Sequence, residues 1–476
     1  MEGKMTSRQT AILTIAFFAA AASAFAANPK YVFLFVGDGM STPQRMVADE
    51  FSRACGNGPL AMNSLPYQST MRTCSLTSMV TDSAAAATAM ACGAKTRNGA
   101  IGTDKGGNQL ESCAYVAHKA GKKVGIITTV TITHATPAAF YARRKNRGEL
   151  YGISVDLANS GFEFFAGGGL DNKYKDKRSP DFAKYGHAYR YAESKGYKIV
   201  RNKEDFLALK PSDGKVLTRF RNGCLDNAID ADGSLPSIAE MVSKAVEMLD
   251  GDGGFFIMAE GGRIDWSAHA NDAATNLRDV IALDDAVKVA LVFLDKHPDE
   301  TLVLVVGDHE TGGLAMGFAG TGYAIYVDRL AGQTKSVGAF EQDVGKLYGK
   351  RLDVSFDEVK PLIEGAFGLR FGGDPRVDPM VLTKDELAEI EKAFAHDNEF
   401  HKAKVEENPK YDGKKRYLLG GVCRLVLSHK AGLGWSSGAH TAMPTLTTAK
   451  GIGAERFSGS VENDEFGRRL KDLCGR

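Results

Sequence analysis

Acidic and imidazole side chains follow three apolar runs of the sequence that are typical of buried strands. They are Asp38 after YVFLFVG (31–37), Glu260 after FFIMA (255–259), and Asp308 with His309 after TLVLVVG (301–307). Because the carboxyl ends of parallel strands meet at one edge of a sheet, we expect these side chains to converge there. Converging carboxylates repel one another unless a cation lies among them. The pattern therefore predicts a metal site at this edge.

A second set of candidate ligands lies in the segments RIDWSAHAND and SSGAHTAMP. Asp265 and His269 are four residues apart, so a helix would place both side chains on one face. His440 would complete a three-ligand zinc site with an open position, as a catalytic zinc requires. Mixed imidazole and carboxylate sets favour Zn²⁺, whereas oxygen ligands alone favour Mg²⁺. Each of these residues alone is better explained as a turn aspartate or a surface histidine, but their joint placement favours a metal centre.

The segment VTDSAAAATAMACG (80–93) contains a candidate nucleophile. Its alanine run favours a helix, and Asp82 or Ser83 stands near the N-terminus of that helix. One interpretation is an ordinary helix cap. The other is that the small side chains let a substrate approach the helix start, where free N–H groups and partial positive charge suit a phosphate. The segment by itself favours the cap.

The elements that must position these residues alternate between strand and helix. A fourth apolar run, KKVGIITTVTITHATPAAF (122–140), leads toward His134 and Thr136. A helical pattern follows the run that ends at Glu260, with apolar residues at Val280, Leu283, Val287, Leu291 and Leu294. This alternation predicts an α/β fold with a central, mostly parallel sheet sandwiched by helices.

The composition is that of an ordinary globular protein. The chain has 476 residues, of which 43% are hydrophobic and 25% charged, and its formal net charge is +1. That length suits one α/β domain with insertions or two domains. A net charge this close to zero gives no indication of a nucleic-acid or membrane-surface partner. Because the sequence has no internal repeat and no low-complexity linker, we predict a single domain over residues 27–476.

Residues 1–26 have the pattern of a secretory signal peptide. Lys4 and Arg8 precede the apolar stretch AILTIAFFAAAASAFA, which ends in small residues and predicts cleavage before Ala27. The alternative is a membrane anchor, but the apolar stretch is short for one, and no later segment is apolar enough to span a bilayer. We therefore expect an exported protein, periplasmic or secreted, without a membrane span in the mature chain. Disulfides can persist there, but the pairing of the seven cysteines cannot be read from their spacing.

Six segments together resemble the alkaline phosphatase family. They are FVGDGMS, VTDSAAAATA, HATPAAF, AEGGRIDWSAHANDA, VVGDHETGG and GAHTAMP, and they occur in the order of the family. The resemblance implies that Ser83 is the phosphorylated nucleophile in the hydrolysis of small-molecule phosphate monoesters. It also implies that Arg147 binds the phosphate, since a guanidinium can donate to two phosphate oxygens at once. A crown-type insertion would correspond to about residues 321–430, and a homodimer is expected.

The resemblance further implies two zinc ions and a third metal, usually Mg²⁺. The ligand sets are Asp265, His269 and His440 for one zinc; Asp38, Asp308 and His309, approached by Ser83, for the other; and Asp38, Thr136 and Glu260 for the third metal. His134 and Trp266 occupy positions at which members of the family have different residue types. We expect both to lie beside the substrate and the metals without binding a metal. A histidine at position 134 leaves zinc as an alternative occupant of the third site.

Two other classes of protein stay open at this point. The nearer is another hydrolase of the same superfamily, a phosphodiesterase or a sulfatase, although Ser83 and Arg147 together favour monoesters. The other is a non-catalytic, metal-binding exported protein, but buried carboxylates are rarely kept without a charged partner. The segment GWSSG (434–438) fits a serine-hydrolase pattern that needs a strand before the serine and a helix after it. We expect a glycine-rich loop there instead.

Overall fold

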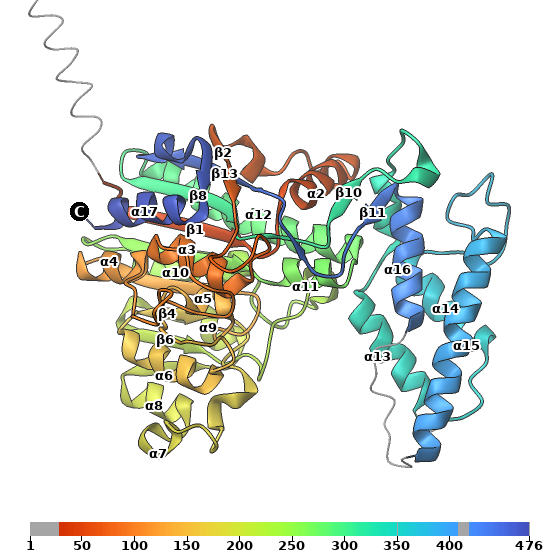
Figure 1. The fold of residues 1–476 in the computed structure, drawn as a ribbon, viewed down its shortest axis with the longest axis horizontal. Coiled ribbons are helices and arrows are strands. Elements are labelled where there is room, and N and C mark those ends of the chain that lie inside the picture. The colour runs from red at the N-terminus through yellow and green to blue at the C-terminus, as the bar shows by residue number, and fades with distance from the viewer. Residues whose placement is uncertain (1–27, 350, 408–417, 476) are drawn as a thin grey trace, which may run out of the picture.

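A ten-stranded sheet forms the centre of the molecule (Figure 1). The computed structural model describes residues 28–349, 351–407 and 418–475, so the predicted signal peptide lies outside the described residues. In spatial order the strands are β14 (Gly459–Glu462), β2 (Tyr67–Arg72), β13 (Thr445–Gly451), β8 (Thr301–Gly307), β1 (Tyr31–Gly37), β7 (Phe255–Gly261), β3 (Lys123–Thr128), β4 (Phe164–Ala166), β6 (Lys215–Thr218) and β5 (Tyr197–Val200). Within the described residues only β13 runs against its neighbours in this sheet. The prediction of a mostly parallel sheet is confirmed.

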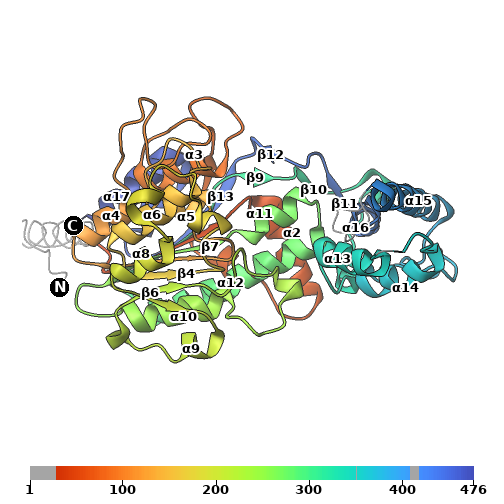
Figure 2. The same cartoon turned by 90° about the horizontal axis from the view of Figure 1, so that it is seen from below.

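Helices cover both faces of the sheet (Figure 2). One face carries α3 (Ser83–Cys92), α4 (Cys113–Lys119), α5 (Ala135–Ala138), α6 (Leu150–Ser160), α8 (Ala188–Ser194) and α17 (Asn463–Cys474). The other carries α2 (Thr42–Ala54), α9 (Lys203–Leu207), α10 (Ile238–Leu249) and α12 (Ala273–Lys296). Successive residues of β1 face opposite sides, so Phe33 and Phe35 belong to one core and Val32 and Leu34 to the other. Because both faces of the central strands are buried, their sequences are continuous apolar runs.

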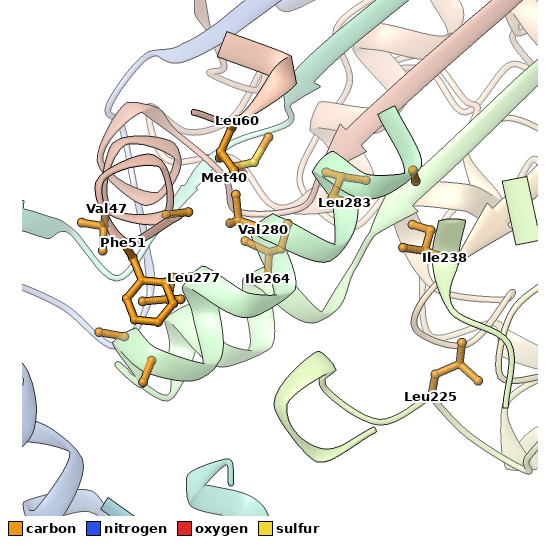
Figure 3. Packing of buried hydrophobic residues seen from close by; sticks show 14 of the residues in the cluster. Met40, Val47, Phe51, Leu60, Leu225, Ile238, Ile264, Leu277, Val280 and Leu283 are labelled. Atoms are coloured by element: carbon orange, nitrogen blue, oxygen red, sulfur yellow. The ribbon is translucent and has the colours of Figure 1, made fainter. Parts of the chain in front are cut away.

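The core beneath α2 is formed by the stripe of apolar residues that the sequence predicts on α12. Figure 3 shows Val47 and Phe51 of α2 beside Leu277 of α12, with Val280 one turn further along α12. Leu283 continues the same stripe toward the end of β7. These contacts fix α12 across the sheet and thereby fix the turn that precedes it.

The three central strands end at the same level. Gly37 of β1 pairs with Gly261 of β7 and with Gly307 of β8. The residues that follow Gly37 and Gly307 therefore leave the sheet side by side. A Cβ at Gly307 would overlap the carbonyl oxygen of Met40, so glycine lets the turn after β1 lie against the end of β8.

A helical unit lies beside the sheet, at the right of Figure 1. It consists of α13 (Val337–Tyr348), α14 (Phe356–Phe367), α15 (Lys384–Glu407) and α16 (Leu418–Lys430). It falls within the insertion expected at about residues 321–430, and its assignment as a crown stays a prediction. The helical spacing of Leu387, Ile390 and Phe394 after Leu382 predicts an amphipathic helix, and α15 begins at Lys384. The lysine-rich stretch at residues 408–415, for which the sequence predicts an exposed loop, lies outside the described residues.

The sequence predicts a glycine-rich loop at GWSSG, and this prediction is wrong for the first part of the segment. Its first two residues belong to β11 (Leu433–Trp435), which pairs with β10 (Leu314–Met316). The next element, β12 (His440–Thr441), pairs with β9 (Glu310–Thr311). Because a strand and not a helix follows Ser436, this serine does not sit on a nucleophile elbow.

Two further features of the chain concern export. No helix of the described residues has the length and apolar character needed to cross a membrane. All seven cysteines lie within the described residues and carry free thiols. Burial, together with the neighbouring thiol of Cys474, raises the pKa of Cys113 well above its ordinary value.

Candidate active site

Helix α3 holds Ser83 at its first position. Asp82 caps the helix, because its side chain accepts a hydrogen bond of 3.0 Å from the backbone N–H of Ala85. Ser83 is therefore free of the capping role, and its Oγ lies 3.1 Å from Nε2 of His309. Gly467 allows α17 to pack closely on this helix, since a Cβ there would overlap the carbonyl oxygen of Ala89. The cap of the first interpretation is therefore present at Asp82, and the approach of a phosphate to Ser83, the second interpretation, stays a prediction.

Asp265, His269 and His440 form the first cluster of candidate metal ligands. The two histidines face each other with their Nε2 atoms 3.1 Å apart. His269 Nδ1 lies 2.8 Å from the carbonyl oxygen of Gly438, and His440 Nδ1 lies 2.9 Å from that of Thr81. A carbonyl only accepts, so both rings donate from Nδ1 and leave lone pairs on Nε2. Two lone pairs at this distance repel each other unless a cation or a proton lies between them, so the pair fits a zinc site.

The helix that supplies two of these ligands forms as the sequence predicts. Asp265 and His269 lie on α11 (Arg263–His269), where their spacing of four places both on one face. Asp265 Oδ2 lies 3.4 Å from His269 Nε2, and its Oδ1 lies 3.6 Å from His440 Nε2. Thr311 holds this carboxylate in place, because its hydroxyl donates to Asp265 Oδ1 over 2.6 Å.

Asp38, Asp308 and His309 form the second cluster, and all three are fully buried. His309 Nε2 lies 3.2 Å from Asp38 Oδ1 and 3.4 Å from Asp308 Oδ2. Apart from the His309 ring, neither of these carboxylate oxygens has a hydrogen-bond partner among the described residues. Burial and the charge of Asp38 raise the pKa of Asp308 well above its ordinary value. A buried cation would offset the repulsion between the two carboxylates and the cost of burying their charge, so these donors fit a metal.

Asp38 also belongs to a third cluster, with His134 and Glu260. His134 Nδ1 lies 3.4 Å from Glu260 Oε1 and 3.7 Å from Asp38 Oδ2. Thr136 donates to Asp38 Oδ2 over 3.3 Å, so the structure brings together every residue expected at the third metal. Apart from their contact with each other, His134 Nδ1 and Glu260 Oε1 have no hydrogen-bond partner among the described residues. These donors fit a cation, and His134 adds a possible nitrogen ligand that the sequence had left outside the set.

Arg147 and Trp266 lie at the open side of these clusters. One Arg147 nitrogen lies 3.1 Å from Asp82 Oδ2, and another lies 3.2 Å from His134 Nε2. These contacts hold the guanidinium at the start of α3, with a third of the side chain exposed. Trp266 is 42% exposed and meets His134 edge to face. Both residues therefore lie where a ligand entering from solvent would meet them.

Comparisons with known proteins agree with this geometry. The alkaline phosphatase family profile matches residues 29–475. Alkaline phosphatase 4 of Bacillus subtilis (strain 168) is 30% identical over 455 residues, which cover 92% of this chain and 87% of that protein. Alkaline phosphatase 3 of the same organism is 30% identical over 404 residues, covering 82% and 76%. The chain belongs to the alkaline phosphatase family.

Solved structures extend this agreement to the fold. The crystal structure of Thermus thermophilus alkaline phosphatase superimposes with a TM-score of 0.77 at 28% identity, covering 95% of this chain and 93% of that one. The cold-active alkaline phosphatase from the psychrophile Shewanella sp. also gives a TM-score of 0.77, at 23% identity, and covers 94% of this chain and 100% of that one. The second comparison shows the shared fold alone.

Sequence reasoning missed several residues that orient the clusters in this member of the alkaline phosphatase family. Thr128 donates to Glu260, and Thr311 donates to Asp265. The backbone carbonyls of Thr81 and Gly438 set the ring orientation of His440 and His269. Thr311 and Gly438 lie within two of the six family segments, but hydroxyl and carbonyl contacts of this kind leave no pattern of residue types. They could not be found without the fold.

Proposed function

We propose that this protein hydrolyses phosphate monoesters through a phosphoserine intermediate on Ser83. The observation that supports this most directly is the contact of 3.1 Å between Ser83 Oγ and His309 Nε2. It places a hydroxyl that does not cap its helix beside a cluster of buried acids. The N-terminus of α3, a helix of ten residues, adds partial positive charge that suits a phosphate.

The three clusters are proposed as metal sites. Asp265, His269 and His440 would hold one Zn²⁺; Asp38, Asp308 and His309, with Ser83, a second; and Asp38, Thr136 and Glu260 a Mg²⁺ ion. His134 beside the third set makes zinc an alternative there. The unpartnered oxygens of Asp38, Glu260 and Asp308 support this proposal. Bound zinc would lower the pKa of the Ser83 hydroxyl and stabilise charge on the leaving oxygen.

Arg147 is proposed to bind the phosphate of the substrate. Its guanidinium is held beside Ser83 by Asp82 and His134, so its remaining N–H groups can donate to oxygens that do not bridge to the leaving group. Trp266, exposed next to His134, would contact the organic part of the ester. These two roles would make the enzyme specific for the phosphoryl group and tolerant of different leaving alcohols.

The proposed reaction has two displacements at phosphorus. Ser83 Oγ forms a bond to phosphorus, and the bond from phosphorus to the leaving alcohol breaks. Water then attacks the phosphoserine, the bond from Ser83 Oγ to phosphorus breaks, and inorganic phosphate leaves with Ser83 restored. Arg147 would keep its contacts with the same phosphoryl oxygens through both steps.

The test compares three nitrophenyl substrates on the purified protein. We expect fast hydrolysis of p-nitrophenyl phosphate, and much slower hydrolysis of bis(p-nitrophenyl) phosphate and of p-nitrophenyl sulfate. A chelator should abolish activity, and added Zn²⁺ with Mg²⁺ should restore it. Acid quenching during turnover should trap phosphate on Ser83. Preferred hydrolysis of the diester or the sulfate, or phosphate trapped on another residue, would contradict the proposal.

Export and assembly are proposed on the sequence pattern. Residues 1–26 would be removed on export to the periplasm or the medium, leaving residues 27–476 as one catalytic domain with the insertion at about 321–430. The mature chain is proposed to form a homodimer. Edman sequencing of the exported protein and its mass by light scattering test these two points.

A further inference from the structure

A cavity of 230 Å³ lies under the turn between β7 and α11, on the α10 and α12 face of the sheet. Its apolar walls include Leu225, Leu235, Ile238 and Leu283, and Figure 3 shows three of these, Leu225, Ile238 and Leu283, around this part of the core. None of the proposed metal ligands lines it. The cavity is therefore distinct from the candidate active site.

One buried carboxylate faces this cavity without a full set of partners. Asp279 of α12 is only 6% exposed, and its Oδ1 accepts a hydrogen bond of 2.7 Å from the backbone N–H of Ala228. Its Oδ2 has no hydrogen-bond partner among the described residues. The nearby hydroxyl of Ser267 has the carbonyl oxygens of Arg263 and Ile264 within hydrogen-bond distance, at 2.9 and 3.0 Å, and its single proton serves one acceptor at a time. Burying an ionised carboxylate with one oxygen unpaired lowers the free energy of unfolding unless a hydrogen-bond donor or a cation reaches that oxygen.

The other charged groups that line the cavity are already engaged. The basic ones are Arg263, which donates to the carbonyl oxygen of Leu225 over 2.7 Å, and Lys203, which pairs with Glu240 over 2.8 Å. The acidic ones are Asp226, paired with Arg221, and Asp232, which accepts from Ser234. Counting Glu240 and Asp279, acidic residues outnumber basic ones in the lining. Since Glu240 and Asp226 are paired with basic side chains, Asp232 and Asp279 remain against Arg263, and this excess of negative charge favours a cation and disfavours a phosphate ester.

We propose that this cavity binds a small organic cation with an apolar body, such as an arylalkylammonium, whose ammonium group donates to Asp279 Oδ2. The carboxylate supplies the charge partner, and the leucine and isoleucine walls bury the hydrocarbon part. The volume restricts the occupant to a compound smaller than a typical drug-sized ligand. The site lies beside Gly261 and Arg263, which connect Glu260 to Asp265, so it borders the candidate active site from within the fold.

The test uses benzylammonium chloride as the probe and benzyl alcohol as its neutral match. Calorimetric titration of the full-length protein should show saturable binding of the cation to one site per chain. The alcohol should bind at least about tenfold more weakly, because it lacks the charge that pairs with the carboxylate. Binding of the cation should persist in excess inorganic phosphate, which separates this cavity from the phosphate-binding site.

Three variants assign the binding to Asp279. Asp279→Asn keeps the size of the side chain and should weaken benzylammonium binding by about tenfold or more. Asp285→Asn, on the exposed side of the same helix, should leave binding unchanged. If Asp279→Asn fails to fold, Ala282→Phe decides the question, because a phenyl group at this lining position fills the cavity and should abolish binding. Absence of binding to the wild-type protein, equal binding of the alcohol, or undiminished binding to the folded Asp279→Asn or Ala282→Phe protein would overturn the proposal.

Discussion

His269 and His440 face each other across 3.1 Å between their Nε2 atoms, although 171 positions separate them in the chain. Each ring donates its Nδ1–H to a backbone carbonyl, of Gly438 and Thr81 respectively. Both Nε2 lone pairs therefore point into the same space, next to Asp265. This arrangement is stable only with a cation or a proton between the rings, and it is the basis of the first prediction.

His440→Ala should lower the zinc content by about one ion per chain and reduce turnover at least about 100-fold, because a three-ligand site loses a ligand. Elemental analysis of the purified variant and a phosphomonoester assay measure both effects. Ser436→Ala, in the nearby GWSSG segment, is the matched control and should change neither. Loss of activity in the control with zinc retained would instead favour a serine-hydrolase mechanism.

Ser83→Ala should keep all bound metal and lose about a thousandfold or more of kcat, because it removes the nucleophile and leaves every histidine and carboxylate ligand in place. Metal analysis and steady-state kinetics on the same sample separate the two effects. Asp82→Ala tests the adjacent helix cap. It should mainly lower the free energy of unfolding, by about 1 kcal/mol, because the hydrogen bond from the Ala85 N–H is lost. It also removes the contact of Asp82 with Arg147. A fully active Ser83→Ala protein would rule out the phosphoserine route.

Arg147→Ala should weaken competitive inhibition by inorganic phosphate by about 10- to 100-fold, as expected for the loss of a charge-assisted pair of hydrogen bonds. KM for phosphate monoesters should rise, and the metal content should stay unchanged because Arg147 belongs to none of the ligand clusters. Arg147→Lys should recover only part of the affinity, since an ammonium does not offer the planar fork of a guanidinium. Unchanged phosphate inhibition in Arg147→Ala would place the phosphate contact elsewhere.

Gly467→Ala should destabilise the protein by about 1–3 kcal/mol, because the added Cβ would overlap the carbonyl oxygen of Ala89 and lie 2.7 Å from that of Met90. The matched control is Gly365→Ala in α14, where a Cβ would meet no atom within 4 Å. That change should be neutral or stabilise by up to about 1 kcal/mol through helix propensity. Urea denaturation of both variants measures the contrast, and equal effects would refute the close packing of α17 on α3.

Asp279 should make folding stability fall as the pH rises. Burial raises the pKa of Asp279 from 3.8 to about 7, against the smaller opposing effects of the Ala228 N–H, of Arg263 and of the Ser267 hydroxyl, while Asp272 adds to the rise. The folded state therefore binds the proton more tightly than the unfolded state. This contribution to stability is fully present below pH 3.8 and is lost as the pH rises through about 7.

Asp279→Asn removes this titration and isolates its effect. The Tm of the variant minus that of the wild type should increase as the pH rises through about 7, because only the wild type must ionise a buried carboxyl. Thermal denaturation of both proteins in matched buffers measures the difference. A Tm difference that does not vary with pH would show that Asp279 does not titrate in this range.

The architecture could be predicted from the sequence because its periodicity is local. Seven-residue apolar runs such as 31–37 and 301–307 correspond to β1 and β8, and the stripe that contains Val280 and Leu283 lies on α12. Every second residue of β1 faces the same core, and Asp265 and His269, four residues apart on α11, share one face of the helix. Both relations follow from backbone geometry. GWSSG was less predictable, since a three-residue strand such as β11 depends on its partner β10.

The sequence by itself determined which side chains are available to bind metal and phosphate, and that they follow the ends of buried strands, because residue type and hydrophobic period belong to each short segment. Only the tertiary structure decided which of them meet. Thr81 and His440 are brought together by the path of the chain over 359 positions, and this contact sets which nitrogen of His440 faces Asp265. The same holds for His134 beside Glu260 and for Asp279 in its cavity, because distances between remote segments depend on how the sheet and its helices pack and not on any pattern along the chain.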